Sequence, residues 1–235
     1  MSVVEIPVYV PGWLRQTLRR IKRTMLGPAH TTLDLCGDRD LEWSFVASQL
    51  PYGPGDALDF GCDGTCLSLI AARRGFKVLA IDLERHALPW QHPNREFVQG
   101  DVLELTLPHA KFDLVINCSS VEHVGLAGRY GVSEERSDGD LEAMRRLREL
   151  MKPGAVQLLT VPLGRDNVFR PWHRVYGEKR LPALLEGYEV MRAEFWRKSQ
   201  ERGWAACDRE EALSFKAERT IYALGCFVLR RPVEQ

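Results

Sequence analysis

Residues Ala57 to Cys66, ALDFGCDGTC, decide the fold of this chain. They read as a short apolar strand that runs into a glycine turn and then into a helix. A second strand follows at KVLAIDLE, residues 77–84, and ends in the carboxylate of Asp82. In an open parallel sheet, a turn and a carboxylate in this order lie at the same edge and enclose a nucleotide. The sequence therefore predicts a pocket for a cofactor that contains a nucleoside.

Strands and helices continue to alternate after this unit. Strands separated by helices form a parallel sheet with right-handed crossovers, and ligands bind at the carboxyl ends of such strands. We expect a doubly wound α/β fold, with a mostly parallel seven-stranded sheet and helices on both faces. Its strands are predicted at residues 57–61, 76–82, 96–98, 112–118, 155–161, 188–196 and 221–230, and its helices at 64–74 and 138–151.

Two regions stand apart from this alternating pattern. Residues 1–55 are predicted as an N-terminal helical extension that packs on the core formed by residues 56–235. Its first helix, WLRQTLRRIKRTML at 13–26, is basic and amphipathic; a docking helix is the simpler interpretation, and binding to an anionic surface is the alternative. A second helix is predicted at 38–50. Residues 162–182 lose periodicity, which indicates an insertion over the ligand site.

The charge and cysteine content exclude several classes of protein. Lys plus Arg and Asp plus Glu both number 32, so no overall field favours a nucleic acid or a membrane as partner. Six scattered cysteines, without short paired spacings or a secretory leader, indicate a reduced cytoplasmic protein. No apolar run approaches the length of a membrane-spanning helix. The expected partner is a small molecule.

Acidic residues lie in or near the ends of three successive predicted strands. Asp59 precedes the glycine turn, Asp82 lies 23 residues later, and Asp101 ends the next short strand in FVQGDVLEL. Asp82 can accept hydrogen bonds from both ribose hydroxyls, and Asp101 can accept one from the exocyclic amine of adenine. Gly61 lets the backbone approach the ligand, because it has no side chain that would collide. Together these residues predict an adenosine site.

With these motifs the chain resembles the class I S-adenosylmethionine-dependent methyltransferases over residues 56–162, and more loosely to 230. The matching segments, in the family's order and spacing, are LDFGCDGTC, VLAIDL, QGDVLEL, FDLVINCSSVEHVG and LRELMKPGAVQLLTVP. The resemblance implies S-adenosylmethionine as the cofactor. The residues it implies for binding are Asp59, Gly61 and Cys62 at the methionine, Asp82 and Leu83 at the ribose and adenine, Asp101 and Val102 at the base, and Asn117 and Ser119 beneath the methionyl part. Asp63 and Thr65 depart from the family, which usually has glycines there.

The segment SVEHVG, after the fourth predicted strand, carries the expected catalytic residues. Methyl transfer from a sulfonium to a hydroxyl is an in-line displacement, and the hydroxyl proton has to be removed. His123 is the predicted general base, since histidine accepts protons near neutral pH. Glu122 is predicted to orient His123 or to hold a metal or a sugar hydroxyl. A packed or surface histidine is the alternative.

Two polar and aromatic clusters are predicted to bind the acceptor. The first is Arg129 with Tyr130, and the second lies in RPWHRVYGEKRLPALLEGYE at His173, Arg174 and Tyr176. Aromatic faces with Arg and His donors suit a polyhydroxylated ligand. The order of these segments resembles saccharide O-methyltransferases, including those that methylate mannose polysaccharides. The predicted function is methyl transfer to a hydroxyl of a sugar or an oligosaccharide.

Several alternatives stay open at the level of sequence. The first alternative is that the site binds a divalent cation such as magnesium, although no ligand spacing supports it. The residues that could bind this cation are Glu122, His123, Asp138 and Asp140. Other functions are a methyltransferase for another small polar metabolite, a nicotinamide-dependent oxidoreductase, a binding module without catalysis and an RNA methyltransferase. The oxidoreductase would need a full GxGxxG turn, which the chain lacks. Trp13 and Trp43 would suit a homodimer contact.

Overall fold

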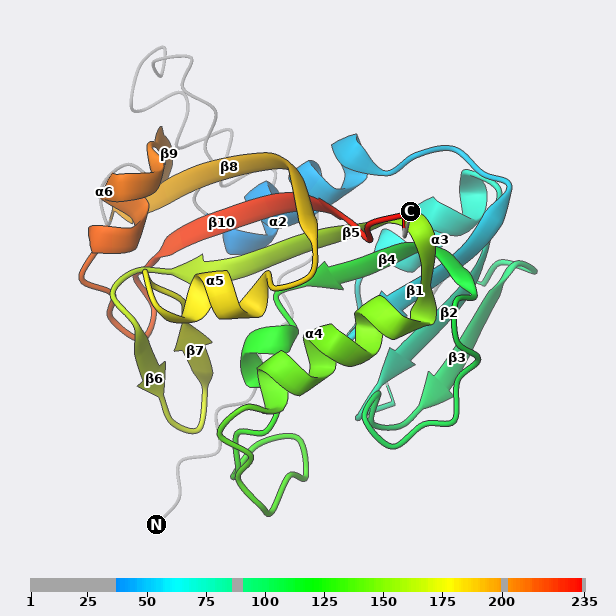
Figure 1. The fold of residues 1–235 in the computed structure, drawn as a ribbon, viewed down its shortest axis with the longest axis horizontal. Coiled ribbons are helices and arrows are strands. Elements are labelled where there is room, and N and C mark those ends of the chain that lie inside the picture. Colours follow the sequence, from blue (N-terminus) through cyan, green and yellow to red (C-terminus); the bar gives the residue numbers. More distant parts are fainter. Residues whose placement is uncertain (1–36, 86–90, 200–202, 234–235) are drawn as a thin grey trace, which may run out of the picture. The chain divides into compact units, whose positions relative to one another are not determined.

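The computed structural model describes residues 37–85, 91–199 and 203–233. Figure 1 shows their helices and strands around a central sheet. The helix predicted at 13–26, most of the extension predicted at 1–55, and Trp13 lie outside the described residues. In the described part of the chain, no helix has the length and apolar character needed to cross a bilayer.

The central sheet has eight strands in the order β3-β2-β1-β4-β5-β10-β8-β9. Its parallel strands are β1 (Gly55–Phe60), β2 (Phe76–Asp82), β3 (Arg95–Gln99), β4 (Phe112–Cys118) and β5 (Met151–Leu163). The antiparallel pairs that extend it involve β8 (Glu189–Ser199), β9 (Gly203–Cys207) and β10 (Ala223–Arg230). The predicted α/β fold with a mostly parallel sheet is confirmed, but the predicted number of seven strands is wrong. The prediction missed β9, because GWAAC is short and shows no alternating pattern.

Two separate hydrophobic cores lie between the sheet and its helices. The helices beside the sheet include α2 (Asp38–Gln49), α3 (Leu67–Arg73), α4 (Gly139–Leu150) and the short α5 (Arg180–Leu184). Leu147 of α4 belongs to one core and Phe45 of α2 to the other. Side chains alternate along a strand, so β4 contributes Val115 to the first core and Ile116 to the second. In Figure 1, α4 and α5 lie in front of the sheet and α2 and α3 behind it.

The segment predicted as an insertion, 162–182, contains a small β-hairpin. Strand β6 (Asn167–Phe169) pairs antiparallel with β7 (His173–Val175). Strand β7 is buried and contacts η1 (Val121–His123), a 3-10 helix directly after β4. The hairpin therefore lies against the segment that carries His123. A last short helix, α6 (Arg209–Ser214), precedes β10.

Candidate active site

A cavity of about 890 Å³ opens at the carboxyl ends of the parallel strands. Its walls come from the loops after β1, β2, β3 and β4, from helix α2 and from the segment that begins with η1. Ligands of open α/β sheets bind at this edge. The volume lies within the range of sites that enclose small organic ligands. The loops that the sequence predicted to converge therefore line one cavity.

The glycine turn after β1 is shaped by contact with the end of β4. Gly61 has a φ of +65°, and a side chain at this position would collide with Ser120. Ser120 Oγ donates a hydrogen bond of 3.1 Å to the Gly61 carbonyl. Glycine is therefore required here both by the left-handed backbone and by the close approach of Ser120, which follows β4.

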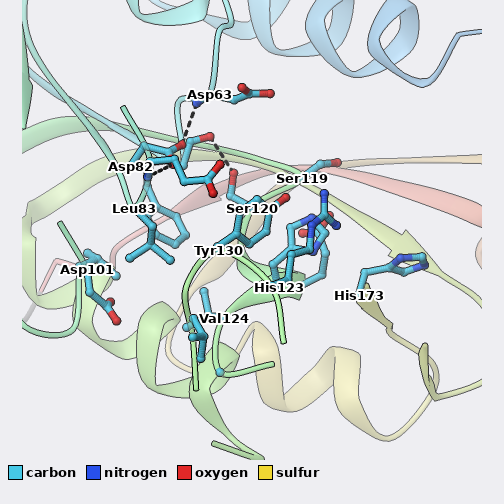
Figure 2. A pocket seen from close by; sticks show the side chains of 18 of the residues that line it. Asp63, Asp82, Leu83, Asp101, Ser119, Ser120, His123, Val124, Tyr130 and His173 are labelled. Atoms are coloured by element: carbon cyan, nitrogen blue, oxygen red, sulfur yellow. Dashed lines mark hydrogen bonds and ion pairs between the residues drawn. The ribbon is translucent and has the colours of Figure 1, made fainter. Parts of the chain in front are cut away.

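The carboxylate of Asp82 is held by two backbone groups. The Asp63 N–H donates to its Oδ2 at 2.9 Å, and the Glu84 N–H donates to its Oδ1 at 3.0 Å. Both bonds fix the side chain at the end of β2, on the wall of the cavity (Figure 2). Leu83 lines the wall beside it. The structure thus orients an acidic group where the sequence predicted contacts with a ribose.

Asp101 follows β3 and lines the same cavity together with Val102. Its Oδ1 accepts a hydrogen bond of 2.9 Å from the Leu103 N–H, which fixes the side chain in a turn. The structure therefore brings together five of the predicted cofactor residues at the ends of three adjacent strands: Gly61, Asp82, Leu83, Asp101 and Val102.

Three other predicted cofactor residues do not line the cavity. Asp59 is 2% exposed, near Ser68 and Arg95, and burial raises its pKa to about 7. Cys62 is buried, and the loss of solvent raises the pKa of its thiol. Asn117 is buried, and its Nδ2 donates to the Met144 sulfur at 3.5 Å. Their placement corrects the prediction: these side chains lie beneath the site instead of contacting a ligand in it.

Ser119 lines the cavity at the end of β4 and contacts a residue that the sequence analysis missed. Its Oγ donates a short hydrogen bond to Glu42 of α2. Glu42 is 1% exposed and also accepts a hydrogen bond of 2.9 Å from Arg39. The sequence signal for Glu42 is weak: a charged residue beside Leu41 on the buried face of a helix.

His123 has a defined tautomer. Its Nδ1 lies 2.5 Å from the Trp172 carbonyl oxygen, which can only accept, so Nδ1 carries the proton. Burial lowers the pKa of His123 to about 4, and the positive charge of Arg129 acts in the same direction. At pH 7 the ring is therefore neutral, and Nε2 presents a lone pair. His123 lines the cavity, and its lowered pKa makes the imidazole a weaker base than the sequence analysis assumed.

Glu122 is neutral at pH 7 and does not form an ion pair with His123. Its side chain is 2% exposed, and burial raises its pKa to about 8. Its Oε1 lies 3.8 Å from His123 Nε2, which is beyond hydrogen-bond distance. Its Oε2 has no hydrogen-bond partner among the described residues. The prediction that Glu122 orients His123 is not supported by this geometry.

Aromatic and cationic side chains form the wall around His123. The guanidinium of Arg129 lies 4.3 Å from the centre of the Tyr130 ring and 5.4 Å from that of Trp172. His173 is 8% exposed, its pKa is lowered to about 4 by burial, and its Nε2 lacks a hydrogen-bond partner within the described ranges. Tyr222, which the sequence analysis missed, lies 5.5 Å from His173 between ring centres. Arg129, Tyr130 and His173 line the cavity.

The predicted acceptor residues Arg174 and Tyr176 do not line the cavity. Arg174 is 2% exposed and donates to backbone carbonyls on both sides of His123: to Glu122 at 3.4 Å and to Val124 at 2.6 Å. Tyr176 is buried, and its hydroxyl donates to Asp140 at 3.1 Å. Arg174 thus holds the backbone beside His123, and Tyr176 holds the buried Asp140 side chain.

Two of the carboxylates predicted as alternative metal ligands, Asp138 and Asp140, are engaged by Arg180. Asp140 is fully buried and accepts a hydrogen bond of 2.9 Å from Arg180 Nε. Asp138 precedes α4 without capping it through its side chain, and its Oδ1 accepts from Arg180 at 3.2 Å. The described residues contain no group of three or more His, Cys, Asp or Glu side chains arranged to hold a metal ion.

A solved structure relates this fold to methyltransferases. The 1,6-didemethyltoxoflavin-N1-methyltransferase of Burkholderia thailandensis, solved with 1,6-didemethyltoxoflavin and S-adenosylhomocysteine, matches with a TM-score of 0.57 and 18% identity. The match covers 97% of this chain and 93% of that one. Similarity at this identity concerns the fold alone. The chain has the fold of the class I S-adenosylmethionine-dependent methyltransferases.

Two curated relatives are similar in sequence. A probable S-adenosylmethionine-dependent methyltransferase of Mycolicibacterium smegmatis is 31% identical over 150 residues, which cover 57% of this chain and 52% of the relative. The ribosomal protein L11 methyltransferase of Thermus thermophilus is 31% identical over 137 residues, 50% of this chain and 47% of the relative. The chain thus spans about half the length of the curated relatives it matches.

One protein family matches the part of the chain that contains most of the site. The family is described as "Caenorhabditis protein of unknown function, DUF268", and it matches residues 100–224. This region is just over half of the chain and includes Asp101, His123 and the hairpin with His173. The chain therefore belongs to the DUF268 family.

Proposed function

We propose that this protein is an S-adenosylmethionine-dependent methyltransferase. The observation that carries the proposal is the row of Asp101, Asp82 and Gly61 on one cavity wall, at the ends of three adjacent strands. The residues fit an adenosine cofactor: two oriented carboxylates suit hydroxyls and an amine, and the turn at Gly61 has no room for a side chain. The sequence similarity to curated methyltransferases supports the same assignment.

Each part of the cofactor has proposed contacts in this cavity. Asp82 would hold the ribose, with Leu83 beside it. Asp101 and Val102 would contact the adenine. Gly61 and Ser119 would flank the methionine part. When bound, S-adenosylmethionine supplies an electrophilic methyl group on a sulfonium, and the protein has to align an acceptor with it.

We assign the acceptor side to the wall formed by Arg129, Tyr130 and His173, with His123 as general base. His123 is neutral at pH 7, and its proton on Nδ1 is fixed by the Trp172 carbonyl. Nε2 is therefore free to accept the proton that an acceptor hydroxyl loses as its bond to the methyl carbon forms.

A hydroxylated acceptor, such as a sugar or an oligosaccharide, would satisfy two buried polar atoms. Glu122 Oε2 and His173 Nε2 both lack a partner within the part of the chain that the structure describes. A hydroxyl both donates and accepts hydrogen bonds, so it can pair with a protonated carboxyl and with a neutral imidazole. The stacked Arg129 and Tyr130 provide a flat face and additional donors for such a ligand. Another small polar metabolite is the alternative acceptor.

The test is methyl transfer from labelled S-adenosylmethionine to a panel of monosaccharides and oligosaccharides, with Asp82→Asn as a negative control. His123→Gln should lower turnover by about 100-fold or more, because it removes the base. It should leave the affinity for S-adenosylhomocysteine unchanged. His109→Gln is the matched control, since His109 is exposed and does not line the cavity. Equal turnover in His123→Gln and the natural protein would remove His123 from the mechanism, and no transfer to any hydroxyl would contradict the sugar acceptor.

A further inference from the structure

Two arginine side chains lie over the aromatic ring of Trp172, beside the residues assigned to the acceptor. The guanidinium carbon of Arg129 lies 5.4 Å from the centre of this ring, and that of Arg219 lies 5.0 Å from it. Arg129 also lies over the Tyr130 ring, at 4.3 Å. Burial lowers the pKa of His173, and the positive charges of both arginines act in the same direction. The acceptor wall therefore lies in a positive local field.

Among the arginines that line the cavity, Arg129 differs in its partners. Arg39 pairs with Glu42 at 2.9 Å, and Arg136 pairs with Glu104 at 3.2 Å. Arg129 forms no ion pair with any residue that the structure describes. Its charge therefore lacks a carboxylate within ion-pair distance in the described part of the chain.

Contact with aromatic rings leaves the donors of Arg129 available to a ligand. A guanidinium is planar, and its N–H groups point outward in that plane, so rings that cover its face do not occupy them. The Arg129 side chain donates no hydrogen bond to the described residues. Carboxylates and phosphates accept guanidinium donors in pairs, which gives both strength and a defined orientation. These donors therefore suit an anionic group better than a single hydroxyl.

We propose that the acceptor carries an anionic group, a carboxylate or a phosphate, and that Arg129 binds it. This assignment rests on the proposed function, which gives the wall around Arg129 to the acceptor. The buried Glu122 on the same side is protonated at pH 7, so it does not repel an anion. Arg219 adds a second positive charge near the Trp172 ring, which attracts an anion to the site.

An anionic group at Arg129 lies close to the proposed base. The ring centre of His123 is 5.7 Å from that of Tyr130 and 6.5 Å from that of His173, and Figure 2 shows the three side chains beside one another. A sugar with an acidic substituent can therefore contact Arg129 and present a hydroxyl to His123. Burial is the main cause of the lowered pKa of His123, and the charge of Arg129 adds to it. A bound anion offsets that charge, so the acceptor itself makes His123 a stronger base.

The test compares three monosaccharides that differ in charge. The probes are D-glucose, D-glucuronate and D-glucose 6-phosphate, titrated by calorimetry at constant ionic strength into the protein saturated with S-adenosylhomocysteine. At least one anionic probe should bind about tenfold or more tightly than glucose, because a charged acceptor strengthens the hydrogen bonds of the guanidinium. The anionic probe that binds more tightly identifies carboxylate or phosphate as the accepted group. If neither binds more tightly than glucose, the inference is wrong.

Variants of Arg129 show whether this side chain causes the preference. Arg129→Gln should weaken the preferred anionic probe by about tenfold or more and change glucose binding by less than about twofold. Arg129→Lys should keep part of the preference, because it retains the charge but loses the paired donors. Arg145→Gln is the matched control: Arg145 is exposed on α4 and does not line the cavity, and its loss changes the net charge equally. The control should keep the full preference.

Affinity for S-adenosylhomocysteine separates failure of this inference from failure of the proposed function. The natural protein and Arg129→Gln should bind it equally, since Arg129 is assigned to the acceptor. If Arg129→Gln keeps the preference for the anionic probe, the inference is overturned and the proposed function stands. Weaker binding of S-adenosylhomocysteine with an unchanged preference would assign Arg129 to the cofactor and also overturn it. If the natural protein does not bind S-adenosylhomocysteine, the proposed function fails, and this inference fails with it.

Discussion

Replacement of Glu122 by glutamine tests the electrostatics of the site. Glu122 is buried, and its pKa is raised to about 8. Glutamine has nearly the same shape and stays neutral at every pH. At pH 6 the natural carboxyl is protonated in the folded protein and ionised in the unfolded chain, where its pKa is 4.5. The two proteins therefore differ in how their stability depends on pH.

The magnitude follows from the shift in pKa. When folding raises the pKa of a group, that group contributes most to the stability of the folded protein at pH values below its pKa in the unfolded chain. This contribution is lost as pH rises to the pKa of the group in the folded protein. For Glu122 the loss runs from pH 4.5 to about pH 8. Each pH unit in this window costs about 1.4 kcal/mol, so the natural protein should lose about 3 kcal/mol between pH 6 and pH 9 from this group. Glu122→Gln should not show this loss.

The assay is urea unfolding of both proteins at pH 6, 7, 8 and 9. As pH rises, the unfolding free energy of Glu122→Gln should increase relative to that of the natural protein. The other titrating groups are the same in both proteins, so their contributions cancel in the comparison. Glu104→Gln is the control, because the Glu104 side chain is 67% exposed and its replacement leaves Glu122 in place; the loss assigned to Glu122 should persist in this variant. A constant difference for Glu122→Gln would mean that Glu122 is ionised at pH 6, and the description of a neutral carboxyl beside His123 would be wrong.

Three further predictions concern the turn, the buried network and metal dependence. Gly61→Ala should weaken binding of S-adenosylhomocysteine by about tenfold or more in calorimetry, because the methyl group meets Ser120 at a φ of +65°; unchanged affinity would contradict the fit. Asp140→Asn should lower the unfolding free energy in urea by about 3 kcal/mol or more, because it leaves the cation of Arg174 buried without its acidic partner; a loss below about 1 kcal/mol would show that the network is not needed for stability. A chelator should leave turnover unchanged, since Asp140 is engaged by Arg180; a loss that magnesium restores would contradict this.

The residues that the sequence correctly placed on the cavity wall have local signals. Gly61, Asp82 and Asp101 each lie at or just after the end of a short strand-like segment, so their position on the sheet edge can be read from neighbouring residues. Parallel topology then brings the three strand ends together without further information. The same local pattern gave the position of His123 after β4.

The residues that were misplaced depend on details that no local pattern contains. Asp59 and Asn117 lie one or two residues inside their strands, and alternation of side chains sends them away from the cavity. Arg174 looks like a ligand-binding residue in sequence, but its partners are backbone carbonyls about 50 residues away in the chain. Glu42 and Tyr222 reach the cavity from distant segments, so only the folded structure reveals them.

Titration of S-adenosylhomocysteine into the natural protein and into Asp82→Asn, followed by calorimetry, is the most direct test of the proposed cofactor site. The cavity predicts one binding site per chain, and Asp82→Asn should bind at least about tenfold more weakly, because the amide replaces an acceptor carboxylate oriented by two backbone groups. Absence of binding to the natural protein, or equal affinity of the two proteins, would contradict the assignment of this cavity to S-adenosylmethionine.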